Sequence, residues 1–295
     1  MGGDRHQNRS VGSFTDDDGV VIQTVEWPVE QPRAVVQISH GIGEHARRYA
    51  ALAADLNRAG FTVVADDHRG HGATGTGQWG DDPARLGRLG RGGLVSTIAA
   101  IARFRDLTRD RFPGLPLVLV AHSWGSLMAQ ITLNDEPDAY DGVVLSGTAY
   151  RLPGSMDAGD LNRKHRRLGS TGAEWLSRDP AVAAAWVADP LTFPALTTKL
   201  IGVRDSLRLL GVPARDLPAA LPLLIQVGSD DTLGGARSAQ RLARAYRERS
   251  GLRDVTVHVY DGARHEVYNE TNRDEVVADL VDWIRTRVLK EEERA

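Results

Sequence analysis

The sequence predicts an α/β fold in which a mostly parallel sheet is covered by helices on both faces and carries a helical insertion. Short apolar runs rich in β-branched residues alternate with segments whose apolar residues recur at helical spacing. These runs are apolar throughout rather than at every second residue, which is typical of parallel strands buried on both faces. The stretch 149–218 contains no such run, which predicts an insertion between two strands.

The first half of the chain alternates strand and helix. We expect strands over 33–40, 61–67, 115–122 and 142–147, and helices from Tyr49 to the stop signal at Gly60, over 94–107 and over 125–133.

The second half continues the pattern after the insertion. Strands are expected over 221–230 and 255–260. Between them we expect a helix, whose apolar face is formed by Ala239, Leu242, Ala243 and Tyr246. A closing helix follows, whose apolar stripe is Val276, Val277, Leu280, Val281 and Ile284. Asn272, three residues before Glu275, is expected to cap its start.

The insertion has a different composition from the rest of the chain. It contains six prolines and three helix-compatible patches, at 173–179, 181–189 and 203–211. We therefore divide the chain into a first core part, 1–148, a helical lid or cap, 149–218, and a second core part, 219–295. Because the insertion leaves the sheet after one strand and rejoins it at the next, we expect it over the carboxyl ends of the strands, where such sheets bind ligands.

Charge and composition exclude several classes of protein. The 36 Lys and Arg residues against 39 Asp and Glu give a formal net charge of −3, so no global positive field attracts nucleic acid. Cysteine is absent, which excludes disulfides, thiolate metal sites and a cysteine nucleophile. The first fourteen residues hold no apolar leader, and no apolar run approaches the length of a membrane span. We expect a cytoplasmic protein without a nucleic-acid partner.

Ser123 lies in the sequence context of a nucleophile elbow. The run LPLVLVAH leads directly into Ser123, Trp124 and Gly125 and then into a predicted helix. Such a strand–turn–helix holds the serine in a strained conformation at a strand end. Ala121 and Gly125 flank the serine two positions away on each side, and their small size lets strand and helix backbones pack closely. We therefore predict that Ser123 is a nucleophile.

A serine hydroxyl needs a base to take its proton, and the base needs a carboxylate to orient it. In chains with such an elbow the order is serine, acid, histidine. His265 lies in the loop after the strand 255–260, and Asp230 and Asp231 end the strand 221–230, so both loops open at one edge of the sheet. We prefer Asp231 because it lies further into its loop. Asp261 is the other candidate acid, although it is better placed to shape its own turn.

An oxyanion formed at Ser123 needs backbone donors. The Trp124 amide is one candidate, and the loop after the strand 33–40, His40-Gly41-Ile42-Gly43, supplies the other. We choose the amide of Ile42.

Five motifs together resemble one family of enzymes. HGIGEHARRYA (40–50), DDHRGHGATG (66–75), AHSWGS (121–126), GSDD (228–231) and DGARH (261–265) are similar to those of the monoacylglycerol lipase and lysophospholipase family of serine α/β-hydrolases. The resemblance covers about 20–290. It implies the α/β-hydrolase fold, a triad of Ser123, Asp231 and His265, oxyanion donors at Ile42 and Trp124, a lid formed by the insertion, and hydrolysis of a mono-acyl ester. Ala121 and Ser126 depart from the family, which often has glycine there.

Two other patterns point to different chemistry. Residues 41–46 fit G-x-G-x-x-A between a strand and a helix, with Asp66 about twenty residues on, which is typical of dinucleotide binding. That hypothesis leaves Ser123, Asp231 and His265 without a role. Residues 70–75 also fit G-x-G-x-x-G, but glycine-rich sequence that we expect to be a loop follows them.

Several histidines lie at short spacings near one sheet edge: His40, His45, His68, His71 and His122. They are compatible with a metal cluster, yet few acidic residues converge with them, so we favour histidines that brace loops through hydrogen bonds.

Two groups in the insertion have alternative roles. The basic run 163–167 is either a solvated surface or a contact for anionic lipid. Trp175, Trp186, Leu191 and Phe193 either line an acyl tunnel or pack the insertion onto the core.

These features predict a serine hydrolase of single-chain lipid esters, acting on monoacylglycerol through an acyl-enzyme, with no cofactor and no metal. A lysophospholipase, a short-chain carboxylesterase and a ligand-binding protein on the same fold are the alternatives. The expected partner is a small lipid ester, with transient membrane or micelle contact through the lid.

Overall fold

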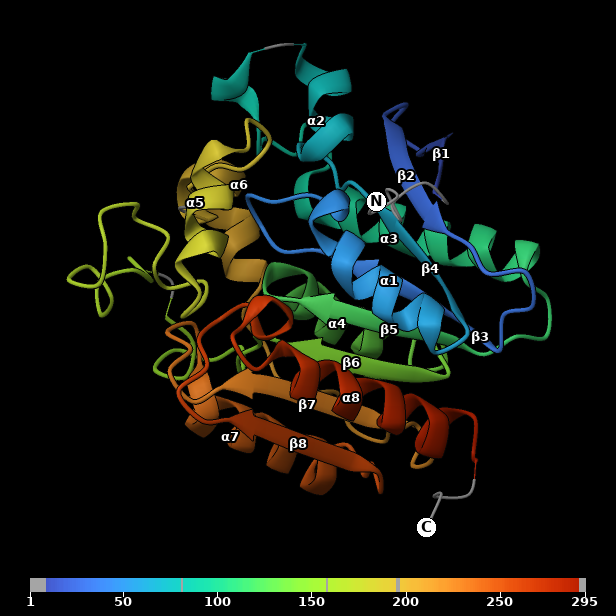
Figure 1. The fold of residues 1–295 in the computed structure, drawn as a ribbon. Helices are drawn as coiled ribbons and strands as arrows, with labels where there is room; N and C mark the ends of the chain where they lie inside the picture. The colour runs from blue at the N-terminus through green and yellow to red at the C-terminus, as the bar shows by residue number, and fades with distance from the viewer. Residues whose placement is uncertain (1–8, 81, 158, 195–196, 292–295) are drawn as a thin grey trace, which may run out of the picture.

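The computed structural model describes residues 9–80, 82–157, 159–194 and 197–291, and Figure 1 shows their arrangement. Over these ranges eight strands form one sheet in the order β1-β2-β4-β3-β5-β6-β7-β8. Within the same ranges no helix is both long and apolar enough to span a bilayer.

The strands agree closely with the predicted runs from the third onward. Their bounds are β1 Ser10–Thr15, β2 Val21–Trp27, β3 Ala34–Ser39, β4 Phe61–Asp66, β5 Leu117–His122, β6 Gly142–Ser146, β7 Leu223–Gly228 and β8 Val255–Tyr260. Strands β3 to β7 are buried along their whole length, as expected for parallel strands covered on both faces.

In the sheet order β4-β3-β5-β6-β7-β8, all neighbouring strands are parallel. Strand β2 pairs antiparallel with both β1 and β4. After β3 the chain runs outward to β4 and then returns to β5 on the other side of β3. The strand order therefore reverses between β3 and β5, and loops that follow these two strands open a crevice at their carboxyl ends.

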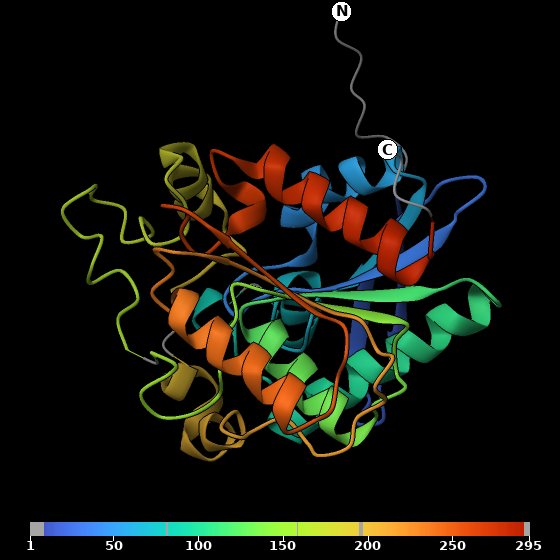
Figure 2. The ribbon, with the colours of Figure 1, turned by 90° about the horizontal axis from the view of Figure 1, so that it is seen from below.

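Helices cover both faces of the sheet. The longer ones are α1 Ala50–Arg58, α2 Gly72–Trp79, α3 Gly93–Arg111, α4 Trp124–Asp135, α5 Pro180–Ala188, α6 Thr197–Arg208, α7 Gly235–Glu248 and α8 Arg273–Trp283. Figure 2 shows α1 and α8 on one face and α3, α4 and α7 on the other. Each group buries its own apolar cluster against the strands, so the sheet lies between two hydrophobic layers.

The segment 149–218 lies at the carboxyl ends of the strands, where α5 and α6 project beyond the sheet in Figure 1. Two of its three helix-compatible patches are helical: 181–189 forms most of α5, and 203–211 begins within α6. The third, 173–179, consists of turns instead. Its Glu174 side chain accepts hydrogen bonds from nearby backbone amides, which competes with helix formation.

Sequence reasoning missed the N-terminal hairpin and one helix. Strands β1 and β2 were not expected, and α2 forms where we predicted a glycine-rich loop. Glycine is required in α2 because a Cβ at Gly75 would lie 2.5 Å from the carbonyl oxygen of Gly70. The Asp67 carboxylate accepts the Ala73 amide at 2.7 Å, which stabilises the start of the helix.

Asn272 stands at the predicted cap position of α8 but does not make the predicted capping hydrogen bond. Asn272 precedes the helix, yet its side chain makes no hydrogen bond to the helix backbone. Its amide nitrogen donates to Glu275, and its oxygen accepts from Arg178 at 2.8 Å, so tertiary pairing replaces the local cap.

Candidate active site

Ser123 lies on a sharp turn between β5 and α4. Its backbone adopts φ 51° and ψ −122°, a positive φ that is strained for a residue with a side chain. The turn brings the start of α4 against the end of β3, so closely that a Cβ at Gly125 would lie 2.3 Å from the carbonyl oxygen of Ser39. The Ser123 amide donates to Ser146 in β6 at 2.9 Å and holds the turn to the sheet.

Three side chains from separate loops meet at this turn. His265, which follows β8, lies with Nε2 2.8 Å from Ser123 Oγ. Its Nδ1 lies 2.9 Å from Asp231 Oδ1, in the loop after β7. The Asp231 oxygen also accepts the Leu233 amide at 2.9 Å, so its own loop orients the carboxylate. The predicted serine, acid and histidine are thus in hydrogen-bond contact.

The other two candidate acids contact other groups. Asp230 is partly exposed and pairs with Lys164 of the insertion. Asp261 lies on the surface turn after β8, where Ser229 contacts it. Asp231 is therefore the candidate carboxylate that reaches His265.

Burial and the charge of Asp231 have opposite effects on the pKa of His265. Burial alone would lower the pKa of His265, but the negative charge of Asp231 and its hydrogen bond outweigh burial and raise this pKa above its ordinary value. The imidazole is thus a stronger base than a free histidine.

The predicted backbone donors lie beside the serine. Ile42 and Trp124 line the same cavity as Ser123, and Trp124 is the first residue of α4. The amides of the first helical turn have no partner within the helix, so the helix start presents N–H groups toward bound negative charge. This placement is suited to stabilising an oxyanion at the serine.

Above the serine lies a mainly apolar cavity of about 510 Å³. Its lower wall comes from the sheet loops and α4, whereas most of the upper wall comes from 149–218, including Met156, Trp175, Trp186 and Leu209. Such a volume suits a small organic ligand.

Trp175 of the insertion packs directly on the imidazole, a contact that sequence reasoning did not identify. The ring centroids of Trp175 and His265 lie 4.6 Å apart, and the Trp175 carbonyl accepts the His265 amide at 3.3 Å. Asn162 accepts the Trp175 amide at 3.0 Å and donates to Glu174 at 2.7 Å. Thr171 donates to the same carboxylate through its backbone and its hydroxyl.

We call Asn162, Thr171, Gly172, Glu174 and Trp175 the Glu174 knot. Burial opposes ionisation of Glu174, but hydrogen bonds from Thr171 and Asn162 lower its pKa to about 2. The knot therefore holds a charged carboxylate that orders an otherwise irregular loop.

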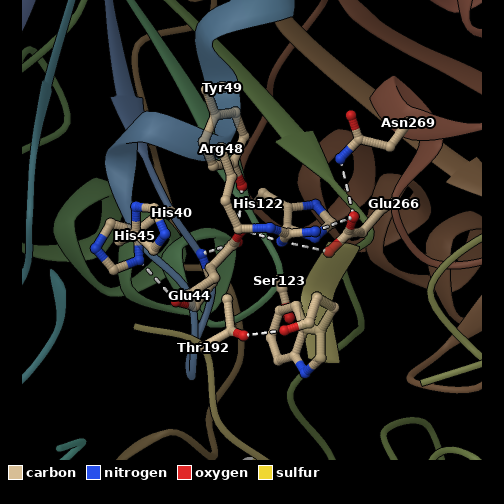
Figure 3. Close-up of polar contacts among 12 residues, drawn as sticks. His40, Glu44, His45, Arg48, Tyr49, His122, Ser123, Thr192, Glu266 and Asn269 are labelled. Atoms are coloured by element: carbon tan, nitrogen blue, oxygen red, sulfur yellow. Dashed lines mark hydrogen bonds and ion pairs between the residues drawn. The ribbon is translucent and has the colours of Figure 1, made fainter. Parts of the chain in front are cut away.

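A second missed feature is a buried ionic network beside the serine. Figure 3 shows Arg48 between Glu44 and Glu266. Arg48 donates to Glu266 through both terminal nitrogens, at 2.7 and 2.8 Å, and to Glu44 at 2.6 Å. Burial favours the neutral acid at Glu266, but the charge of Arg48 keeps the pKa of Glu266 well below its ordinary value. The i, i+4 spacing of Glu44 and Arg48 was the available sequence signal.

The dinucleotide hypothesis is wrong on the contacts of its own motif. The Gly41 amide donates a hydrogen bond to the Glu44 carboxylate at 2.6 Å, so an amide that would face a phosphate already binds an anionic side chain. The chain continues as a 3₁₀ turn, Ala46–Tyr49, before α1. Asp66 is buried against His68 at 2.7 Å rather than free for a ribose.

The histidines make hydrogen bonds within the loops. His40, His71 and His122 are buried, and burial lowers the pKa of each, of His71 to about 3 and of His122 to about 4. His45 pairs with Asp189 of the insertion at 2.9 Å. Among the described residues, no group of three or more His, Asp or Glu side chains could hold a metal ion.

The basic run and the aromatic residues of the insertion, for which the sequence left two roles open, make different contacts. In the basic run, Lys164 pairs with Asp230, and Arg166 with Asp160. Trp175 and Trp186 line the cavity. Phe193 instead packs on His71, with ring centroids 5.3 Å apart.

Comparison with known proteins places this geometry in a family. Residues 30–272 match the family described as serine aminopeptidase, S33. A monoacylglycerol lipase of Mycolicibacterium smegmatis is 32% identical over 291 residues, which cover 94% of this chain and 97% of that protein. The human monoglyceride lipase is 28% identical over 265 residues, which cover 86% of this chain and 82% of that protein.

Solved structures share the fold. A carboxyl esterase from Bacillus coagulans, crystallised with glycerol, superposes with a TM-score of 0.79 over 96% of this chain and 99% of its own, at 24% identity. The chain therefore belongs to the S33 serine aminopeptidase family and has the α/β-hydrolase fold, within which it is a carboxylic ester hydrolase that resembles the monoacylglycerol lipases.

Proposed function

We propose that the protein hydrolyses monoacylglycerols to fatty acid and glycerol through an acyl-enzyme on Ser123. The observation that carries the proposal is the chain of contacts from Asp231 through His265 to Ser123 Oγ beneath a mainly apolar cavity. The names of the curated relatives support the same substrate class.

In the first half of the reaction, His265 Nε2 takes the proton of Ser123 Oγ while that oxygen bonds to the ester carbonyl carbon. The carbonyl oxygen becomes an oxyanion held by the amides of Ile42 and Trp124. When the intermediate collapses, the carbon–oxygen bond to glycerol breaks, and His265 gives its proton to the departing oxygen.

In the second half, water attacks the acyl-enzyme and His265 takes its proton. The acyl–Ser123 bond then breaks, and the same proton returns to Ser123 as the fatty acid leaves. Asp231 orients the imidazole and stabilises its protonated form in both halves.

The segment 149–218 acts in this proposal as the lid that covers the acyl chain. Its apolar side chains form most of the upper cavity wall. Val187, Val203 and Leu207 of α5 and α6 are 59%, 67% and 60% exposed, which suits transient contact with a micelle or membrane that delivers the substrate.

A fluorophosphonate probe and a substrate panel test the proposal. The probe should label one serine per chain, and Ser123→Ala should abolish both labelling and hydrolysis. Monoacylglycerol, presented as monomers and as micelles, should be hydrolysed faster than diacylglycerol, lysophospholipid, p-nitrophenyl butyrate and an amino-acid p-nitroanilide.

Each other outcome identifies an alternative. Faster lysophospholipid or butyrate hydrolysis would indicate a lysophospholipase or a short-chain carboxylesterase, and anilide cleavage would indicate the peptidase activity in the family's description. Ligand binding without turnover of any ester would indicate a binding protein. Labelling that persists in Ser123→Ala would refute the assigned nucleophile.

A further inference from the structure

Gly41, which precedes the candidate donor Ile42, is held on both sides by buried side chains. Its amide donates to Glu44 Oε1 at 2.6 Å, and its carbonyl oxygen lies 2.7 Å from His40 Nδ1. His40 and Glu44 are 0% and 3% exposed. Both peptide units that flank Gly41 are therefore fixed by hydrogen bonds that water does not reach.

The contacts of His40 define its tautomer. A carbonyl oxygen only accepts, so Nδ1 must carry the hydrogen that it donates to Gly41. The His68 backbone amide donates to His40 Nε2 at 3.0 Å, so Nε2 must be bare. His40 is thus a neutral imidazole with one orientation, in agreement with the burial that keeps its pKa well below the ordinary value.

A stacked neighbour holds this ring in place. The imidazoles of His40 and His68 have centroids 3.9 Å apart and planes 22° apart. His68 is fixed by Asp66 at 2.7 Å through Nδ1 and lies 3.1 Å from the Ser39 hydroxyl through Nε2. The orientation of His40 is therefore set by the ends of β3 and β4.

The held carbonyl determines where the next amide points. In a planar trans peptide the C=O and the following N–H point in opposite directions. The Gly41 oxygen faces the His40 ring, so the Ile42 N–H faces away from it, and Ile42 and Ser123 line the same cavity. In the described part of the chain, the Ile42 amide donates to no other group.

We propose that His40 and Glu44 are positioning residues that clamp Gly41 and so aim the Ile42 amide at the oxyanion. Neither side chain lines the cavity, so both act through the backbone. Glu44 also accepts the Tyr49 hydroxyl at 2.8 Å and pairs with Arg48, which keeps its carboxylate rigid (Figure 3). The proposal rests on the proposed function, because it assigns a role only within ester hydrolysis at Ser123.

Two substitutions of His40 separate the clamp from a merely structural role. In His40→Asn, the side-chain nitrogen of asparagine takes the place of Nδ1 and keeps a donor for the Gly41 carbonyl oxygen. Glutamine places its amide near Nε2, so His40→Gln keeps an acceptor for His68 and loses the donor to Gly41. We expect His40→Asn to keep kcat within about threefold of wild type and His40→Gln to lose about 10- to 100-fold.

The loss should be specific to the transition state. In His40→Gln the KM for p-nitrophenyl butyrate should change by less than about twofold, while the inhibition constant of butylboronic acid, whose tetrahedral adduct carries the oxyanion, rises in parallel with the loss of kcat. Glu44→Gln, which keeps an acceptor for the Gly41 amide, should stay closer to wild type than Glu44→Leu.

Leu280→Ala, in the buried face of α8, is the matched control for destabilisation: it should lower the melting temperature and leave kcat within about twofold. Equal losses in His40→Asn and His40→Gln, or a loss confined to KM, would overturn the clamp. A wild-type protein that is neither labelled at Ser123 nor active on any ester would instead overturn the proposed function, and so the two failures are distinguishable.

Discussion

The sheet loops and the inserted segment 149–218 meet at Ser123 but are ordered by different means. Ser123, Asp231 and His265 each follow a parallel strand whose ladder sets the position of the loop. The upper wall of the cavity belongs to a segment with two helices and long turns in its described part, ordered locally by side-chain contacts such as the Glu174 knot. The comparison teaches that the three hydrogen-bonded side chains stand on loops that the sheet anchors, whereas the cavity wall opposite them depends on side-chain contacts within an irregular segment.

His265 is a point at which the two regions touch within the site. Asp231 contacts one edge of its imidazole from the sheet side, and Trp175 packs on its face from the insertion. Perturbing each side separately should therefore have different consequences for catalysis and for local stability.

The largest effect is expected on the sheet side. Asp231→Asn should lower kcat by about 10⁴-fold, because an amide in place of the carboxylate favours the wrong imidazole tautomer. Asp230→Asn is the matched control, since this partly exposed carboxylate pairs with Lys164 on the surface, and it should change kcat by less than about twofold. Ester hydrolysis kinetics check both, and a larger loss in Asp230→Asn would reassign the acid.

The pH dependence should give the next largest effect. His265 must be neutral to accept the Ser123 proton, and its pKa is raised above the ordinary value, so kcat/KM should fall about tenfold per pH unit below that raised pKa. Asp231→Asn removes the charge that raises the pKa, so the residual activity should have its midpoint at lower pH.

The same pKa shift makes stability and activity change in opposite directions with pH. A raised folded-state pKa means that protonated His265 stabilises the fold below its unfolded pKa, and this contribution disappears as pH rises through the folded pKa. Melting curves across this range should therefore lose the contribution where activity increases. An activity midpoint below the ordinary histidine pKa would contradict the assigned balance.

The smallest effect is expected on the insertion side. Glu174→Gln should open the knot, because an amide nitrogen would face donors that now share the carboxylate. Trypsin should then cut after the exposed Lys and Arg residues of the basic run 163–167 about tenfold faster, while the main melting transition moves by less than about 2 °C. Glu248→Gln, an exposed carboxylate on α7, is the control. Equal changes in both regions would show that they unfold as one unit.

Local patterns explain why so much of the sheet was predictable. Buried parallel strands are continuous apolar runs, and the elbow around Ser123 needs small neighbours within two residues on each side. The hairpin β1–β2 escaped prediction because it lies at the sheet edge, where β1 is almost entirely exposed. Helix α2 was not predicted because it contains three glycines, which have low helix propensity, and the close packing of one of them, Gly75, against Gly70 and Leu86 is visible only in the folded structure.

The sequence by itself determined the positions of the strands from β3 onward, the serine turn and which residue types stand at the strand ends, because these depend on neighbours along the chain, whereas the order of the strands in the sheet came from tertiary pairing. Only the tertiary structure decided that Arg48 pairs with Glu266, that Trp175 covers His265 and that His40 holds Gly41. The first two join residues far apart in sequence, and the third requires a particular ring orientation set by His68. Hydrogen bonds and ring contacts of this kind have no periodicity, and their strength comes from burial that exists only once the chain has folded.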